Sequence, residues 1–191
     1  PFKALQELII PEVLENNRAE RSLSMWCGAS SSGQEPYTIS MILDQHFPQL
    51  RSWKVNFVAT DISNKILDKA RQGRYSQLEI NRGLPAPLLL KYFQKDGLEW
   101  QMKPEFRNLI QFKQLNLVTN WPPMPKMDII FLRNVLIYFD VPTKRRILGK
   151  IKELMKPNGF LFLGAAEMPM SVDRSFERVN AARAGCYRIK D

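Results

Sequence analysis

The sequence predicts an α/β fold built on a parallel sheet, with a small antiparallel β insertion. Short apolar runs alternate with segments of helical periodicity on both sides of the middle of the chain. A glycine-containing loop joins the first apolar run to a helical segment, and the alternation stops between about residues 75 and 115. Because strand–helix–strand order builds right-handed βαβ units, and 191 residues can bury a sizeable core, we expect a single domain over residues 1–191.

The elements before residue 74 follow in regular order. They are a helix over residues 2–14, a strand over 22–27, a helix over 36–43, a strand over 53–60 and a helix over 61–73. Pro11 is expected to kink or divide the first helix, while Pro36 sits in the first turn of the second and Pro48 ends it. Gly73 closes the third helix as its C-cap.

The middle of the chain breaks this rhythm. Turn signals at Asp96-Gly97 and Lys103-Pro104 separate short segments that suit strands. This spacing predicts a small β-subdomain inserted at about residues 90–114, of the kind that adds a binding surface.

The α/β order then resumes. The last elements are a strand over residues 127–134, a helix over 141–159, a strand over 160–167 and a terminal strand pair over 176–190. The helix is expected to end at Pro157-Asn158-Gly159.

Composition limits the function classes. The formal net charge is +9 and the pI is about 9.7, which favours a polyanionic partner such as nucleic acid, anionic lipid or an acidic protein. The densest basic cluster, Lys144-Arg145-Arg146, fits a solvated helix face better than a nucleic-acid groove. No apolar run approaches the roughly 18 residues that span a bilayer.

Cysteine and histidine usage favours a reduced, cytoplasmic protein without a metal. Two cysteines and the single His46 cannot form a disulfide framework or a zinc site. Cys27, at the end of an apolar strand, fits a small core residue better than a nucleophile. The chain begins without an initiator Met or a signal peptide, so we expect it to be a fragment of a longer protein.

The loop in MWCGASSSGQEPY, residues 25–37, is the first candidate binding element. No Lys follows Gly33, which disfavours a phosphate-binding P-loop. Ala29 replaces the middle glycine of the dinucleotide pattern, and Glu35 places an acid where a pyrophosphate prefers amides and cations. The loop therefore favours a ligand that carries a positive charge or hydroxyls.

Asp61 is the second candidate. An acid after the second strand of such a fold can accept hydrogen bonds from ribose hydroxyls, but it can equally N-cap the following helix. A nucleoside with a cationic centre satisfies the loop and Asp61 together, and S-adenosylmethionine is such a molecule.

Four motifs, spanning about residues 23–167, resemble those of the CheR chemotaxis-receptor methyltransferases in the same order. They are SMWCGASSSGQEPYTISMIL, VATDISNKILDKARQGRYS, DIIFLRNVLIYFD and LMKPNGFLFLGAAE. RNVLIYFD is the most distinctive. The resemblance implies the doubly wound, Rossmann-like sheet of class I S-adenosylmethionine-dependent methyltransferases. It also implies methylation of glutamate side chains on the cytoplasmic helices of chemoreceptors, with S-adenosylhomocysteine as product.

The resemblance assigns roles to individual residues. The expected cofactor-binding residues are Ala29, Glu35, Asp61, Asn116, Leu117, Arg133 and Asn134. Arg133 and Tyr138 are the expected catalytic residues, because they are placed to position the cofactor and the acceptor carboxylate. The other expectations are a monomer, an acidic protein partner, no nucleic acid, no membrane insertion and no metal.

Two departures and two alternatives accompany this interpretation. Gly28-Ala29-Ser30 stands where the family usually has Ala-Gly-Cys, and the hairpin around Asp96-Gly97 is short, which argues against docking on a receptor tail. The family's N-terminal helical domain is expected to be absent. The alternatives are a nucleic-acid methyltransferase, for which Trp121-Pro122-Pro123 is only a superficial match to a catalytic motif, and a non-catalytic cofactor-binding sensor or scaffold.

Overall fold

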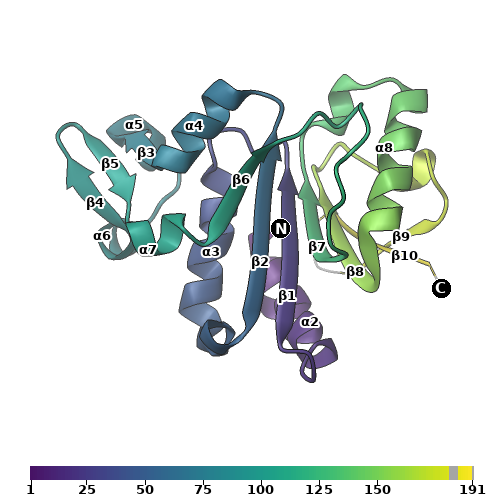
Figure 1. The fold of residues 1–191 in the computed structure, drawn as a ribbon, viewed down its shortest axis with the longest axis horizontal. Coiled ribbons are helices and arrows are strands. Elements are labelled where there is room, and N and C mark those ends of the chain that lie inside the picture. The colour runs from purple at the N-terminus through teal and green to yellow at the C-terminus, as the bar shows by residue number, and fades with distance from the viewer. Residues whose placement is uncertain (181–184, 191) are drawn as a thin grey trace.

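A seven-stranded sheet forms the centre of the computed structural model, which describes residues 1–180 and 185–190 (Figure 1). The strand order is β6-β2-β1-β7-β8-β10-β9. The strands are β1 (Ser22–Gly28), β2 (Lys54–Asp61), β6 (Ile110–Gln114), β7 (Met127–Leu132), β8 (Met155–Leu163), β9 (Phe176–Arg178) and β10 (Cys186–Ile189). The first five in this order pair in parallel, whereas β10 pairs antiparallel with β8 and β9. The doubly wound α/β prediction is confirmed.

The chain reverses its direction across the sheet between β1 and β7. From β1 it moves through β2 to β6 at one edge, and then returns to β7 on the other side of β1. In open α/β sheets, ligands bind outside the carboxyl ends of the strands at such a switch point. The topology therefore directs attention to the residues that follow Gly28 and Leu132.

Helices of very different length accompany the sheet. They are α1 (Phe2–Ala4), the π-helical η1 (Leu5–Ile9), α2 (Ile10–Asn16), α3 (Gln34–His46), η2 (Pro48–Ser52), α4 (Asn64–Gln72), α5 (Gln77–Ile80), α6 (Ala86–Tyr92), α7 (Pro104–Arg107), η3 (Leu136–Tyr138), α8 (Val141–Leu154) and η4 (Pro169–Ser171). The first three run without a break, and the expected irregularity at Pro11 takes the form of the π-helical turn before it. Gly73 adopts the left-handed C-cap conformation that the sequence predicts for α4.

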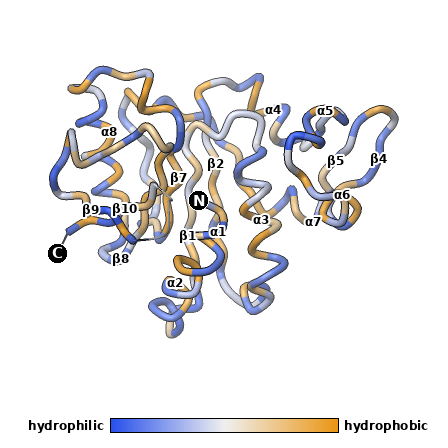
Figure 2. Tube along the Cα trace, turned by 180° about the vertical axis from the view of Figure 1, so that it is seen from behind, coloured by the Kyte–Doolittle hydropathy of each residue, from blue (hydrophilic) through white to orange (hydrophobic). Residues whose placement is uncertain are grey.

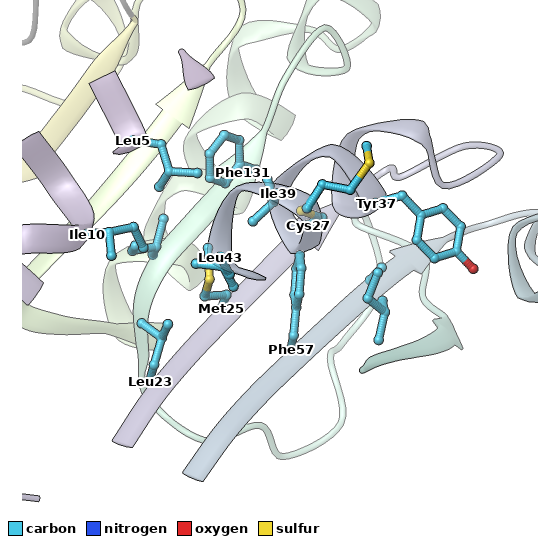
Figure 3. Close-up of a cluster of buried hydrophobic side chains, with 14 of the residues drawn as sticks. Leu5, Ile10, Leu23, Met25, Cys27, Tyr37, Ile39, Leu43, Phe57 and Phe131 are labelled. Atoms are coloured by element: carbon cyan, nitrogen blue, oxygen red, sulfur yellow. The ribbon is translucent and has the colours of Figure 1, made fainter. Parts of the chain in front are cut away.

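Each face of the sheet has its own apolar core, and alternate residues of β1 contribute to opposite cores. Met25 and Cys27 pack with the N-terminal helical segment, α3 and α4 on one face (Figure 3). Trp26 packs on the other face with α8, which alternates hydrophobic and hydrophilic residues (Figure 2). Trp121, from the segment between β6 and β7, contacts Trp26 edge-on at 5.0 Å and extends this second core.

A buried carboxylate joins the N-terminal helical segment to the sheet. Asp128 in β7 accepts hydrogen bonds from the Asn17 side chain at 2.8 Å and the Ser24 backbone amide at 2.7 Å. The ammonium group of Lys156 lies 2.9 Å from the same carboxylate. Because a buried charge is stable only when it is paired and hydrogen-bonded, this network fixes the end of α2 against β1.

The β insertion forms a separate three-stranded antiparallel sheet. Its order is β3-β5-β4, from β3 (Arg74–Ser76), β4 (Phe93–Asp96) and β5 (Glu99–Met102). Gly97 provides the positive φ of the β4–β5 turn, at +61°. The bounds differ from the expected residues 90–114, because β3 begins at Arg74 and β6 pairs in parallel with β2 in the main sheet.

The end of α8 is also corrected. The sequence predicted a helix to Gly159, but α8 ends at Leu154 and β8 begins at Met155. Pro157 lacks an amide proton and disfavours helical geometry at Lys156, so the chain becomes extended earlier. A register shift between Met127 and Ile129 accommodates this irregular start of the strand.

The terminal strand pair is confirmed for β9 and β10, while residues 181–184 lie outside the described residues. None of the helices in the described ranges is both long and apolar enough to cross a membrane.

Candidate functional site

A pocket lies at the switch point, at the carboxyl ends of β1 and β7. It brings together four of the residues singled out from the sequence: Ala29, Glu35, Arg133 and Asn134. The other lining residues are Phe2, Ser30, Ser31, Gln34 and Thr38. Segments that are about a hundred residues apart in the sequence therefore form one site.

The loop after β1 has an unusual backbone. Ala29 and Ser31 have positive φ values of 52° and 49°, which non-glycine residues rarely adopt, and Gly33 follows at 86°. A Cβ on Gly33 would lie 3.1 Å from the Cβ of Ala70 and would add strain at this φ. Gly33 is also the N-cap of α3, so the loop ends with the positive end of a helix facing the pocket.

Asp61 organises this loop from the end of β2. Its carboxylate accepts a hydrogen bond from the backbone amide of Ser31 at 2.9 Å, and its other oxygen accepts one from Ser63 at 3.0 Å. The N-cap of α4 is Ser63, whose hydroxyl accepts a hydrogen bond from Ile66, so Asp61 is not the cap. The helix-cap alternative for Asp61 is therefore wrong.

An ion pair crosses the pocket. The Nη1 atom of Arg133, directly after β7, lies 2.5 Å from Oε1 of Glu35 in the first turn of α3. The guanidinium also lies 5.9 Å from the centre of the Phe2 ring. Burial raises the pKa of Glu35 above its usual value, while the hydrogen bond and positive charge of Arg133 act in the opposite direction. The pair thus places a carboxylate and a guanidinium next to each other in the lining of the pocket.

Asn134 occupies a strained position that a buried acid stabilises. Its φ is +58°, and its backbone amide donates a hydrogen bond to Glu167 at 2.8 Å. The same carboxylate accepts hydrogen bonds from the amides of Val135, Leu136 and Ile137 and from Gly164. Glu167 is buried and thereby fixes the backbone that follows Arg133.

The sequence analysis did not single out Glu167 as a site residue. Glu167 ends the motif LMKPNGFLFLGAAE and follows β8 by four residues. Asp61 is likewise an acid at the carboxyl end of a strand, β2, so this position was the available signal for Glu167. Its partners are consecutive backbone amides about thirty residues away. Such partners leave no pattern in the sequence.

Asn116 and Leu117 lie beside the pocket rather than in it. They follow β6, where the amide of Leu115 donates a hydrogen bond to the Asp61 carbonyl at 3.0 Å. The side chain of Asn116 accepts a hydrogen bond from the amide of Val118, and Leu117 is buried with Trp26 in the second core. Both residues are therefore close in the fold to the end of β2.

Tyr138 is not among the residues that line the pocket. It belongs to η3, and 79% of its surface is exposed to solvent. Cys27, by contrast, is completely buried, and this burial raises the pKa of its thiol well above the usual value. Cys27 is therefore a core residue, as the sequence indicated.

Comparison with known families gives a match over nearly the whole chain. Residues 1–185 match the CheR methyltransferase, SAM binding domain. The chain belongs to the CheR methyltransferase family. Chemotaxis protein methyltransferase 1 of Pseudomonas aeruginosa is 39% identical over 195 residues, covering 100% of this chain and 70% of that protein. Chemotaxis protein methyltransferase Cher2 of Pseudomonas putida is 40% identical with the same coverage.

The family assigns a chemical class and a cofactor. The chain is an S-adenosylmethionine-dependent methyltransferase domain of the chemotaxis type. Among solved structures, the glycopeptide N-methyltransferase MtfA complexed with sinefungin aligns with 80% of this chain and 47% of its own, at a TM-score of 0.46 and 16% identity.

The pocket fits the amino-acid and sulfonium end of S-adenosylmethionine. Two of its polar atoms, the hydroxyl of Ser30 and Nε of Arg133, are buried and have no hydrogen-bond partner among residues 1–180 and 185–190. Buried polar groups normally have partners, so these two atoms are available for a polar ligand. A carboxylate ligand suits Arg133, and the negative charge of Glu35 suits an ammonium or sulfonium group. Among the residues described, no three His, Cys, Asp or Glu side chains are grouped so that they could hold a metal ion.

Proposed function

We propose that this domain transfers a methyl group from S-adenosylmethionine to glutamate side chains on the cytoplasmic helices of chemoreceptors, forming methyl esters. The domain comprises residues 1–191 and acts as a monomer in the cytoplasm. The observation that carries this proposal is the Arg133–Glu35 pair in a pocket whose lining, among the described residues, includes no other acid and no histidine.

The acceptor chemistry suits such a pocket. A glutamate side chain has a pKa of about 4.3 and is already a carboxylate at neutral pH, so no general base has to deprotonate it. Glu35 is paired with Arg133, so we assign it to binding rather than to proton abstraction. Methyl transfer to an amine or a hydroxyl would need a base that the lining residues do not offer.

The proposed reaction is a nucleophilic displacement at the methyl carbon, with a sulfur leaving group. S-Adenosylmethionine supplies an electrophilic methyl group on a sulfonium. The incoming carboxylate oxygen donates an electron pair to the methyl carbon while the carbon–sulfur pair returns to sulfur, which neutralises both charges. Catalysis then rests on proximity and alignment, which the fixed loops after β1 and β7 provide.

The chain's own residues supply binding and orientation. Glu35 offers its charge to the cationic end of the cofactor, and Arg133 offers Nε to a carboxylate. Asp61 fixes the amide of Ser31, and we assign to its carboxylate the hydrogen bonds from ribose hydroxyls. Asn116 and Leu117 are assigned to the adenosine side because they follow the neighbouring strand. Tyr138, exposed in η3, is assigned to the acceptor side.

The nucleic-acid alternative gains no support from Trp121-Pro122-Pro123. Trp121 donates a hydrogen bond from its indole nitrogen to the Leu117 carbonyl at 3.2 Å and packs against Trp26. Trp121 is therefore engaged with the second core, whereas Pro122 and Pro123 are exposed.

Radiolabelled S-adenosylmethionine tests the proposal directly. The protein is incubated with chemoreceptor-containing membranes, and the labelled receptor is then treated with mild base. We expect label on the receptor that is released as a volatile product, because methyl esters are base-labile. The matched control is Arg133→Ala, which should remove the signal. A base-stable product would contradict the methyl-ester assignment, and label on no protein would favour the sensor alternative.

A further inference from the structure

An exposed apolar and basic surface lies directly beside the cofactor pocket. It surrounds a hollow, here called the α8 hollow, lined by Leu136, Ile137, Lys144, Leu148, Ala166, Glu167, Met168, Pro169, Ser171 and Val172. These residues come from η3, α8 and the segment after β8. None of the residues assigned above to cofactor binding is among them.

Large apolar side chains are exposed around this hollow. Ile137 is 49% exposed, Met168 is 62% exposed and Tyr138 is 79% exposed. Val141 and Met170 are exposed as well. Single exposed apolar residues are ordinary, but a group on adjoining segments marks an interaction surface. Methionine and tyrosine are also enriched at such surfaces.

The charge of the surface is positive. Lys144 lines the hollow one helical turn before Leu148, and Arg145 lies one turn after the exposed Val141. Between residues 136 and 152 the chain has five basic residues and one acid, Asp140.

The acids nearby are already engaged within the protein. Asp140 accepts a hydrogen bond from the amide of Thr143 as the N-cap of α8. Asp173 is bonded to Ser175 and lies 3.6 Å from Lys152, and Glu167 is held by backbone amides. The surface therefore favours an acidic partner with apolar residues.

The α8 hollow adjoins the cofactor pocket, because Glu167 of the hollow accepts a hydrogen bond at 2.8 Å from the backbone amide of Asn134 in the pocket. Asn134 lines the pocket and Ile137 lines the hollow, and three residues of chain can span at most about 11 Å. The turns of an α-helix repeat every 5.4 Å, so one or two turns of a docked helix cover this separation. A helix seated on the hollow can thus present a carboxylate one or two turns away to the pocket.

We infer that the α8 hollow docks the methyl-accepting helix of the chemoreceptor, an acidic amphipathic helix, through its apolar and basic rim. The inference rests on the proposed function. Apolar residues of the receptor helix enter the hollow between Ile137 and Met168, and its acidic residues face Lys144 and Arg145. This arrangement is the helix-in-groove mode of recognition, in which charge sets orientation and apolar contact supplies affinity.

The test compares four variants in methylation of a soluble cytoplasmic fragment of the receptor. Ile137→Ser and Lys144→Glu change the rim. Leu109→Ser, at 48% exposure, and Lys54→Glu, exposed at the amino end of β2, are the matched controls. We expect the two rim variants to raise the KM for the fragment at least about tenfold while the Kd for S-adenosylmethionine changes less than twofold, and the controls to match the wild type. Thermal unfolding of each variant verifies that it is folded. If Ile137→Ser does not fold, the result for Lys144→Glu alone decides the test.

The outcomes separate the two proposals. Rim variants that keep the wild-type KM, in a wild-type protein that methylates the fragment, overturn the docking surface alone. A wild-type protein that transfers no methyl group to the fragment overturns the proposed function and the docking surface with it. Rim variants that lose binding to vesicles of anionic phospholipid, but keep the wild-type KM for the soluble fragment, assign the surface to a membrane and overturn this inference.

Discussion

Arg133 and Glu35 form an ion pair at 2.5 Å across the pocket that opens at the switch point of the sheet. Arg133 follows β7 and Glu35 lies in the first turn of α3, so the pair connects the segments that follow β7 and β1. Nε of Arg133 is buried and has no partner among the described residues. The arginine therefore neutralises Glu35 and keeps a donor free for a ligand.

Replacement of Arg133 by Ala should abolish most methyl transfer. The change removes the free donor and leaves the partly buried Glu35 carboxylate unpaired. Loss of one partner of a fully buried pair costs about 2–5 kcal/mol, which is the upper bound here. We expect kcat/KM to fall by at least about 100-fold, with an unfolding transition that remains cooperative. Near-normal turnover would remove Arg133 from the mechanism. Arg51→Ala, whose partner Asp44 keeps a second cation, is the matched control.

Glu35→Gln should weaken cofactor binding and change the pH dependence of stability. Burial raises the pKa of Glu35, so its contribution to stability is present below the unfolded value of 4.5 and is lost as pH rises through the folded value. Glutamine cannot ionise, and the stability of the variant relative to wild type should therefore increase from pH 4 to pH 7. Urea unfolding at both pH values measures this difference. Calorimetry should give at least about a tenfold weaker Kd for S-adenosylmethionine, because the negative charge is gone.

Asp61 and Ser63 allow binding and helix capping to be separated. Asp61→Ala removes the acceptor that holds the amide of Ser31, so we expect at least about a tenfold loss of S-adenosylmethionine affinity. Ser63→Ala removes the N-cap of α4 and should cost about 1 kcal/mol of stability with little change in affinity. Calorimetry and urea unfolding of both variants test this pair. An unchanged affinity in Asp61→Ala would contradict the ribose assignment.

Methylation should be sensitive to salt. The chain carries a net charge of +9 and the proposed substrate helix is acidic, so their attraction is screened as the Debye length falls from about 10 Å at 0.1 M to about 3 Å at 1 M salt. We expect the KM for a soluble receptor fragment to rise over this range while the Kd for the cofactor changes less. A KM that is independent of salt would argue against electrostatic guidance of the substrate.

Local chemistry explains which parts of the fold are predictable from the sequence. The strands that are buried on both faces are short apolar runs, and Gly73 has the conformation that a C-cap requires. The assignment of Ile110–Gln114 to the insertion failed, because parallel pairing with β2 is a long-range contact without a local signal. The predicted end of α8 was wrong because Pro157 acts on the residues before it.

In the candidate site, too, local features are predictable from the sequence and long-range contacts are not. Glu35 and Arg133 are each recognisable within a motif, but their pairing over 98 residues depends on the topology. Asp61 could be predicted as a ligand or a cap, and only the position of Ser63 showed that Asp61 is not the cap. Glu167 could not be assigned, since its partners are backbone amides rather than side chains.

Glu167 should be a positioning residue for methyl transfer. Its carboxylate accepts hydrogen bonds from the amides of residues 134–137, and Asn134 is held at a positive φ. Glu167→Gln is nearly isosteric but lacks the charge and offers one acceptor oxygen, so the loop after Arg133 should lose its fixed geometry. We expect kcat to fall by about 10- to 100-fold, with a smaller change in the Kd for S-adenosylmethionine.

Gly164 provides an independent test of the same contact. A Cβ at this position would lie 2.3 Å from the side-chain oxygen of Asn134 and 2.8 Å from Glu167, so Gly164→Ala should displace the loop without changing any charge. If the loop geometry controls catalysis, both variants should lower kcat, and amide hydrogen exchange of residues 134–137 should become faster in each. Gly149→Ala, at a helical glycine with open space around it, is the control and should leave kcat and exchange unchanged. Normal kcat in Glu167→Gln, together with faster exchange, would show that the contact serves stability alone.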